Sequence, residues 1–198
     1  MQKLSASLVV CLVLLVLAGN ASAQKKEPQE LFIIRENNLA GFMDKTGKVI
    51  IPPQFANVQD FSDGLALVAG NDFFGYIDKT GHPVINLNGL GLRTQGFPRP
   101  FSEGFAAFQL VNTNKWGYLD KTGKIAIEPQ LEEAYDFSEG LARVKQYGKY
   151  TFIDKTGKVI TDPVFDSAGD FSGGLARVAV GTRWGYIDKQ GRYVWRSK

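Results

Sequence analysis

The chain has 198 residues, a formal net charge of +3, and ordinary globular proportions of 44% hydrophobic and 22% charged residues. This charge is too small for the strong positive field of a nucleic-acid-binding protein, and no basic–aromatic surface pattern indicates such binding. The single cysteine, Cys11, excludes an internal disulfide and a cysteine-based zinc site.

The first 23 residues form a predicted secretory signal peptide. Lys3 supplies the positive charge at the start, residues 8–18 form an apolar core, and Ala21-Ser22-Ala23 forms a small-residue cleavage motif. A membrane anchor is the alternative, but the apolar run is shorter than the roughly 20 residues that span a bilayer. We therefore expect cleavage near Ala23, a secreted or periplasmic mature chain, and no membrane span after cleavage.

Residues 24–30 are polar and form a predicted flexible lead-in to a single repeat domain, residues 31–198. Asp44 and Asp78 lie 34 residues apart, as do Asp120, Asp154 and Asp188, and this spacing sets the repeat period. The predicted units are residues 31–64, 65–104, 105–140, 141–174 and a partial unit 175–198. The charged tail after Trp195 is expected to protect the open end of the last unit.

An eight-residue segment, the octet, recurs once in every unit and predicts a strand followed by a tight turn. Its clearest copy, Trp-Gly-Tyr-Leu-Asp-Lys-Thr-Gly, covers residues 116–123; the other copies cover residues 40–47, 74–81, 150–157 and 184–191. Rings at the first and third places lie on one strand face and an aliphatic residue lies on the other, so both faces need burial. Gly at the second place permits another backbone to come close, and Thr151 is expected to loosen the fourth copy there.

The octet turn leads into a predicted return strand, at residues 48–51, 124–127 and 158–160. Its Asp begins the turn by bonding nearby backbone N–H groups, and its Gly takes a positive φ. A second segment, Phe-Ser-x-Gly, alternates with the octet and precedes a short apolar strand. It begins at Phe61, Phe101, Phe137 and Phe171, and its glycines are Gly64, Gly104, Gly140 and Gly174.

These segments predict an all-β fold built from three-stranded antiparallel repeats of about 34 residues. One unit is too small to bury both of its apolar faces, so the units must stack on one another. We predict an open, solenoid-like stack. A closed propeller-like ring is the alternative, although propeller blades usually have four strands and about 40–45 residues.

The alternation of Trp-Gly octets with Phe-Ser-x-Gly segments over residues 31–195 resembles the WG repeat family of bacterial secreted and envelope proteins. The Trp-Gly dipeptide itself occurs at Trp116 and Trp184, whereas Ala40, Phe74 and Tyr150 replace the Trp in the other octets. The resemblance implies a repeat protein outside the cytoplasm. It implies no active-site residues, because the family has no defined active site.

Two kinds of candidate metal ligand lie in the predicted turns: one histidine and the five octet aspartates. His82 is the only histidine, which excludes a histidine dyad or zinc cluster, and we interpret it as an exposed turn residue. The octet aspartates suggest a calcium ladder, but one carboxylate beside a lysine falls far short of the six to eight oxygens that calcium takes. We interpret them as turn caps. They are Asp44, Asp78, Asp120, Asp154 and Asp188.

Three further groups are candidates for binding or catalysis. The octet lysines form a basic row for an anionic envelope polymer if the units stack in register, but we interpret them as solvated turn residues. They are Lys45, Lys79, Lys121, Lys155 and Lys189. The octet rings suggest a sugar-stacking platform, but we assign them to the core. They are Phe42, Phe74, Tyr76, Trp116, Tyr118, Tyr150, Phe152, Trp184 and Tyr186. Glu132-Glu133 lies in a connecting segment, and spacing alone does not make it a glycosidase pair.

The sequence therefore predicts no enzyme, with no catalytic, cofactor-binding or metal-binding residue. We expect a non-catalytic extracytoplasmic repeat module that binds a protein or scaffolds the envelope; a carbohydrate- or cell-wall-binding module is the alternative. A hydrolase in the irregular unit 65–104, where Arg93 and Arg99 interrupt the repeat, is a further alternative. The expected partner is a protein or an envelope polymer and not nucleic acid.

Overall fold

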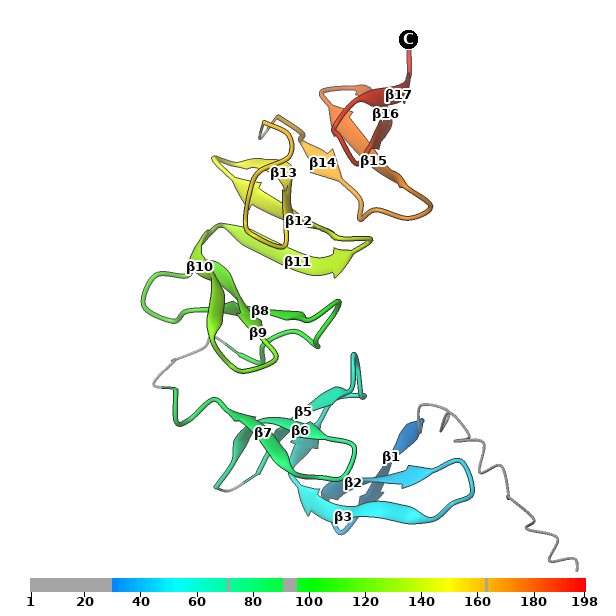
Figure 1. Ribbon diagram of the computed structural model, residues 1–198, viewed down its shortest axis with the longest axis vertical. Coiled ribbons are helices and arrows are strands. Elements are labelled where there is room, and N and C mark those ends of the chain that lie inside the picture. Colours follow the sequence, from blue (N-terminus) through cyan, green and yellow to red (C-terminus); the bar gives the residue numbers. More distant parts are fainter. Residues whose placement is uncertain (1–29, 71, 91–95, 163) are drawn as a thin grey trace, which may run out of the picture.

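Five small antiparallel β-sheets follow one another along the chain and stack into an elongated body (Figure 1). The computed structural model describes residues 30–70, 72–90, 96–162 and 164–198. The first sheet lies at one end of the stack and the fifth lies at the other, so the stack is open. The predicted all-β open stack is confirmed, and the propeller-like ring is wrong.

The sheets contain three or four strands each. The first consists of β1 (Leu31–Glu36), β2 (Leu39–Asp44) and β3 (Val49–Phe55). The second consists of β4 (Asn57–Val58), β5 (Leu65–Ala69), β6 (Phe74–Asp78) and β7 (Pro83–Asn86). The third consists of β8 (Phe105–Gln109), β9 (Trp116–Asp120) and β10 (Ile125–Leu131). The fourth consists of β11 (Glu133–Ser138), β12 (Leu141–Gln146) and β13 (Lys149–Asp154), and the fifth consists of β14 (Ser167–Ala168), β15 (Leu175–Val180), β16 (Arg183–Asp188) and β17 (Tyr193–Arg196).

No helix among the described residues is long and apolar enough to cross a membrane. The predicted signal peptide, residues 1–23, lies outside the described residues, as does all of the lead-in except Glu30.

Every sheet contains one octet strand, which is β2, β6, β9, β13 or β16. The strand before it always begins opposite the octet aspartate, in the pairs Leu31–Asp44, Leu65–Asp78, Phe105–Asp120, Leu141–Asp154 and Leu175–Asp188. This constant register sends the third and fourth octet residues to opposite faces in every copy. Burial on both faces is confirmed in the second and third sheets, where Tyr76, Ile77, Tyr118 and Leu119 are fully buried.

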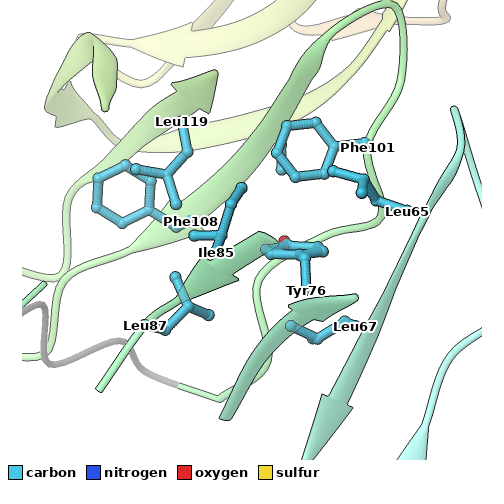
Figure 2. Packing of buried hydrophobic residues seen from close by; sticks show 9 residues of the cluster. Leu65, Leu67, Tyr76, Ile85, Leu87, Phe101, Phe108 and Leu119 are labelled. Carbon is cyan, nitrogen blue, oxygen red and sulfur yellow. The ribbon is translucent and has the colours of Figure 1, made fainter. Parts of the chain in front are cut away.

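The apolar cores lie between successive sheets rather than inside one sheet. Tyr76 and Ile85 of the second sheet pack with Phe108 and Leu119 of the third, as Figure 2 shows. The Phe of each Phe-Ser-x-Gly segment packs on the octet ring of the preceding sheet, with ring centroids 4.7–5.0 Å apart. These pairs are Phe42–Phe61, Tyr76–Phe101, Tyr118–Phe137 and Phe152–Phe171. Each core needs two sheets, as the stacking argument predicts.

A row of hydrogen bonds and ion pairs, the polar spine, connects each Phe-Ser-x-Gly segment to the next. The serine hydroxyl donates to the carbonyl oxygen of the Phe that begins the next segment, in the pairs Ser62–Phe101, Ser102–Phe137 and Ser138–Phe171, each at 2.7 Å. The acidic residue after each serine accepts the N–H of the next segment's Gly, in the pairs Asp63–Gly104, Glu103–Gly140 and Glu139–Gly174 at 2.6–2.9 Å. The same acids pair with the octet lysine of the following sheet.

The acids of the polar spine occupy a backbone conformation that disfavours them. Asp63, Glu103 and Glu139 have φ angles of 52°, 50° and 53°, in the left-handed region that costs a substituted residue roughly 1–2 kcal/mol. The matching place in the fourth segment is Gly173, and no further segment follows it in this chain. The acid is present where its carboxylate has a following sheet to bond, and those bonds offset the backbone strain.

The octet glycine at the second place allows a neighbouring strand to come very close. A Cβ atom on Gly75 would lie 1.9 Å from the Ile85 carbonyl oxygen, and one on Gly117 would lie 2.6 Å from that of Ile127. Gly41 and Gly185 face the carbonyl oxygens of Ile51 and Trp195 in the same way. Glycine is therefore required at this place for the third strand to pair.

In the fourth sheet no strand follows the octet strand β13 in the ladder, so the return strand predicted at residues 158–160 is wrong. Only isolated bridges, Ile153–Val159 and Tyr150–Phe165, form on that side of β13. Thr151 replaces the octet glycine, is fully buried, and donates its hydroxyl to the Thr161 carbonyl oxygen. Thr161 is the counterpart of Ile51, Ile85 and Ile127. The Thr151 side chain fills the space of close approach, so the neighbouring segment lies outside the ladder.

Three strands were not expected from the sequence. β4, β11 and β14 arise in connecting segments and pair with β5, β12 and β15 of the sheet that follows. The second and fifth sheets consequently have four strands each. The second, fourth and fifth sheets also begin in the last residues of the preceding predicted unit.

Removing the close approach at an octet glycine should destabilise the fold. We expect Gly75→Ala to lower the free energy of unfolding by about 3 kcal/mol, because the new Cβ overlaps a backbone oxygen that cannot rotate away. Gly169→Ala is the matched control, since its Cβ would meet nothing nearer than 3.8 Å. Urea unfolding followed by circular dichroism measures both, and equal midpoints would contradict the close-approach argument.

The polar spine should contribute to stability at each interior segment but not at the last one. Ser102→Ala removes a half-buried hydrogen bond to Phe137, and we expect a loss of about 1 kcal/mol. Ser172 is the matched control, because its hydroxyl makes no hydrogen bond among the described residues. The two variants are compared by thermal unfolding, and a loss of equal size at both positions would show that the spine bond is not the cause.

The octet turns should make the fold sensitive to acid. The Thr122 hydroxyl, together with the N–H groups of Thr122 and Lys124, holds the pKa of Asp120 below its usual value. A lowered folded-state pKa stabilises the fold above the unfolded-state pKa, and this contribution disappears as pH falls through the folded-state value. We expect the melting temperature to fall below about pH 4 and to fall less steeply in Asp120→Asn.

The control for this pH dependence is Asp60→Asn, because the exposed Asp60 caps no octet turn. Melting curves recorded between about pH 3 and pH 7 should show a slope like that of the unchanged chain in Asp60→Asn. An Asp120→Asn slope identical to that of the unchanged chain would refute the role of the octet carboxylates.

Candidate binding surfaces

The octet aspartates and His82 lie in turns, with their polar atoms bonded locally. Asp44 Oδ1 accepts the N–H of Thr46 at 2.8 Å, the Thr46 hydroxyl at 2.6 Å and the N–H of Lys48 at 3.2 Å. The other octet aspartates also accept two backbone N–H groups each, so the predicted turn caps are confirmed. His82 is exposed, with Nδ1 2.5 Å from the Thr80 hydroxyl. No group of three or more potential metal ligands occurs among the described residues.

Three octet lysines are exposed turn residues, as interpreted, but they also belong to the polar spine through ion pairs that were not expected. Lys121 pairs with Asp63 at 2.7 Å, Lys155 with Glu103 at 3.2 Å, and Lys189 with Glu139 at 3.2 Å. Each pair joins one sheet to the entrance turn of the sheet before it. The positive charges along this edge are compensated by fixed carboxylates, so these three lysines do not form an open basic row.

The octet rings follow the predicted core assignment inside the stack but not at its end. Phe42, Tyr76, Tyr118 and Phe152 are fully buried, and Tyr76 and Tyr118 also donate their hydroxyls to the carbonyl oxygens of Arg99 and Tyr135. The rings at the first octet place, Phe74, Trp116, Tyr150 and Trp184, are half-buried. Tyr186 is 37% exposed, because no sheet follows the fifth one in the described chain.

Glu132 and Glu133 hold the fourth sheet together, and Glu133 lies in strand β11 rather than in a connecting segment as predicted. Glu133 accepts hydrogen bonds from Lys145, Tyr135 and Tyr150, each at 2.9 Å. Lys145 is the main reason why the pKa of Glu133 lies below its usual value. Glu132 accepts the N–H of Gly148 at 3.0 Å. Arg93 lies outside the described residues, whereas Arg99 belongs to a larger cluster.

That cluster is a row of alternating arginine and tyrosine side chains that joins the third and fourth sheets. This arginine–tyrosine row consists of Arg99, Tyr135, Arg143 and Tyr150. The Arg99 guanidinium lies 5.1 Å from the Tyr135 ring centroid, and that of Arg143 lies 3.6 Å from the same centroid and 5.6 Å from the Tyr150 centroid. A guanidinium at these distances from a ring face is attracted to that ring, so the four side chains form a pre-ordered surface.

Two carboxylates balance the charge of the arginine–tyrosine row incompletely. Arg143 Nε contacts Asp170 at 3.0 Å, whereas Arg99 lies 3.9 Å from Asp136. Burial raises the pKa of Asp136, and the Arg99 Nε and Asp136 Oδ1 atoms are buried with no hydrogen bond among the described residues. Burial and the Glu133 carboxylate raise the pKa of Tyr135 to about 12. Its hydroxyl therefore stays protonated at neutral pH, which suits it to hydrogen bonding rather than to general-base chemistry.

The second surface is the outward face of the fifth sheet, which we call the terminal face. Arg177, Tyr186 and Trp195 lie opposite one another on β15, β16 and β17, and Trp184 packs beside them, 4.8 Å from Trp195 between ring centroids. Trp195 is 49% exposed. The charged tail was expected to protect this end of the stack, but it leaves Trp195 exposed. Trp184 also borders a hollow of about 320 Å³ whose other lining residues, among them Arg183, Tyr193 and Arg196, belong to the opposite face of the sheet.

Sequence reasoning missed both surfaces, although part of the signal was present. Arg143 and Arg177 occupy equivalent places on their strands, and this equivalence marks one cation in each surface. The alignment of Arg99 with Tyr135 depends on how neighbouring sheets are rotated, which repeat spacing does not specify. The exposure of Trp195 depends on the absence of a covering sheet.

The chain is similar to a known protein family and to a solved structure. The sequence model of the family described as WG containing repeat matches residues 41–71, 116–150 and 150–181. A crystal structure of a protein of unknown function from Bacteroides caccae is similar with a TM-score of 0.37 and 11% identity, over 84% of this chain and 77% of that chain. None of the curated proteins compared with the chain matches it. The three family matches fall on the octets and Phe-Ser-x-Gly segments that build the stack, and the chain belongs to the WG-containing repeat family.

Proposed function

We propose that this chain is a non-catalytic, secreted or periplasmic module that binds another protein or an envelope polymer through fixed surfaces of its repeat stack. The predicted signal peptide, residues 1–23, supports the location. The small net charge of +3 argues against nucleic acid as the partner.

The arginine–tyrosine row is the observation that carries a protein-binding function. Arginine and tyrosine are among the residues that contribute most to protein–protein binding energy. In this row they are held in place before any partner arrives, by the Glu133 hydrogen bonds to Tyr135 and Tyr150 and by the Arg143–Asp170 ion pair. Pre-ordering lowers the entropy lost on binding, which favours a specific interface.

The bonding of the other polar groups supports a non-catalytic role. The octet carboxylates accept the N–H groups of their own turns, and the spine carboxylates accept bonds from the following sheet. Catalysis by a carboxylate or hydroxyl needs a partner group aimed at a shared substrate position. In the described residues these groups are aimed at backbone and lysine instead.

A carbohydrate- or cell-wall-binding function is the second candidate, and a separate observation favours it. The terminal face exposes Tyr186 and Trp195, at 37% and 49%, beside a half-buried Trp184. Exposed rings of this size are unusual on an end that faces only water.

The proposed protein-binding function predicts a partner that depends on the arginine–tyrosine row. Residues 24–198 are immobilised and exposed to an envelope extract of the source organism, and retained proteins are identified by mass spectrometry. We expect Arg99→Ala and Tyr150→Ala to reduce retention of the specific partner by about tenfold or more. Arg35→Ala and Phe32→Ala, on the first sheet, are matched controls that should retain it. A partner held equally by the row variants, or no partner at all, would argue against this function.

A further inference from the structure

The terminal face is the open half of the interface that joins every other pair of sheets. Inside the stack, the positions of Arg177, Tyr186 and Trp195 are occupied by Leu67, Tyr76 and Ile85 in the second sheet and by Ala107, Tyr118 and Ile127 in the third. All six of these side chains are buried under the next sheet. At the fifth sheet, Arg177, Tyr186 and Trp195 are all exposed. The face is therefore continuous with an established interface, but no described residue covers it.

The residues of the terminal face are not those of a surface that receives another repeat. Inside the stack, Ile51 and Ile85 pack on the turn glycines of the next sheet, where a Cβ on Gly81 would lie 3.4 Å from Ile51 and one on Gly123 would lie 3.0 Å from Ile85. Trp195 takes the place of these isoleucines and is too large for such a space. Gly173 also replaces the acid that would bond a following segment. These two differences disfavour a second copy of this chain as the occupant.

The terminal face also differs from a polar cap. End repeats that only protect a stack from water carry a polar outer face, whereas this one carries Trp184, Tyr186 and Trp195. The Trp184 ring packs against both other rings, at 4.8 Å from Trp195 and 5.9 Å from Tyr186 between centroids. Such a cluster of rings is suited to contact with a flat, weakly polar ligand surface.

Unpaired positive charge lies beside these rings. The Arg177 guanidinium lies 4.7 Å from the Trp184 ring centroid on this face. Arg183 and Arg196 lie on the opposite face of the sheet, where Arg196 packs on Tyr193. Arg177 forms no ion pair among the described residues, in contrast to Arg143, which pairs with Asp170. The ligand that complements this face therefore carries negative charge, and guanidinium groups match carboxylates in a planar, two-bond geometry.

We infer that the terminal face binds an acidic polysaccharide whose sugar rings carry carboxylates. The C–H face of a pyranose packs on the negative face of an aromatic ring, which assigns the sugars to Tyr186 and Trp195. The carboxylates then reach Arg177, which lies on the same face as these rings. An acidic peptide provides the charges but not two rigid C–H faces. This inference rests on the proposed carbohydrate-binding function and identifies its site and ligand class.

The test measures binding of residues 24–198 to four polymers by calorimetric titration. Polygalacturonate supplies carboxylated sugar rings, dextran supplies neutral rings, and poly-glutamate supplies carboxylates without rings; single-stranded DNA is a fourth probe. We expect polygalacturonate to bind about tenfold or more tightly than each of the others. Tryptophan fluorescence should change on binding, because Trp184 and Trp195 lie in the proposed site.

Variants locate the site. Trp195→Ala and Arg177→Gln should each weaken polygalacturonate binding by about tenfold or more. Phe32→Ala and Arg35→Gln, at the opposite end of the stack, should leave it unchanged. Both terminal positions are exposed, and an unchanged melting temperature confirms that each variant is folded. Equal binding of poly-glutamate, tighter binding of DNA, binding unaffected by the terminal variants, or no binding of polygalacturonate would each overturn the inference. A protein partner that is lost only in Arg99→Ala would still support the proposed protein-binding function. Failure of the polysaccharide inference can therefore be told apart from failure of the proposed function.

Discussion

The contact on which the structure depends is the packing of one aromatic ring on another between neighbouring sheets. Each Phe-Ser-x-Gly segment places its Phe on the octet ring of the preceding sheet, at 4.7–5.0 Å between centroids. Three strands are too few to enclose a ring of this size, so burial requires the next sheet. The strict octet register follows, because a shift of one residue would turn the ring out of the interface.

The polar spine orients the sheets that the rings hold together. Ring packing alone is tolerant of rotation, whereas the serine–carbonyl and acid–glycine bonds repeat at 2.6–2.9 Å and permit one arrangement. Glu103 and Glu139 accept a left-handed backbone conformation to make these bonds. Residues that look like ordinary surface turns in the sequence are therefore structural, and most charges along this edge cannot serve a ligand.

Much of this fold follows from the sequence because its determinants are local. The octet turn depends on Asp44 and Gly47, three residues apart, and the open stack follows from the period and from apolar residues on both strand faces. The pairing of β11 and the alignment of Arg99 with Tyr135 depend on contacts between units, which spacing does not encode. Thr151 departs from the octet pattern in the sequence itself. Its consequence, a missing return strand, depends on the octet glycines of the other copies facing backbone carbonyl oxygens, a place that Thr161 holds opposite Thr151.

The same residue place serves structure inside the stack and is free for binding at its end. From the second to the fifth sheet this place holds Leu67, Ala107, Arg143 and Arg177. Arg143 reaches forward to Asp170 of the following segment and so helps to connect two sheets. No described segment packs on Arg177 in this way, and its guanidinium lies over Trp184 instead. Where no described sheet packs on it, the face of the last sheet is exposed but keeps the geometry of an interface. Trp195 stands where the second and third sheets have isoleucine, and it adapts this face to a ligand other than another repeat.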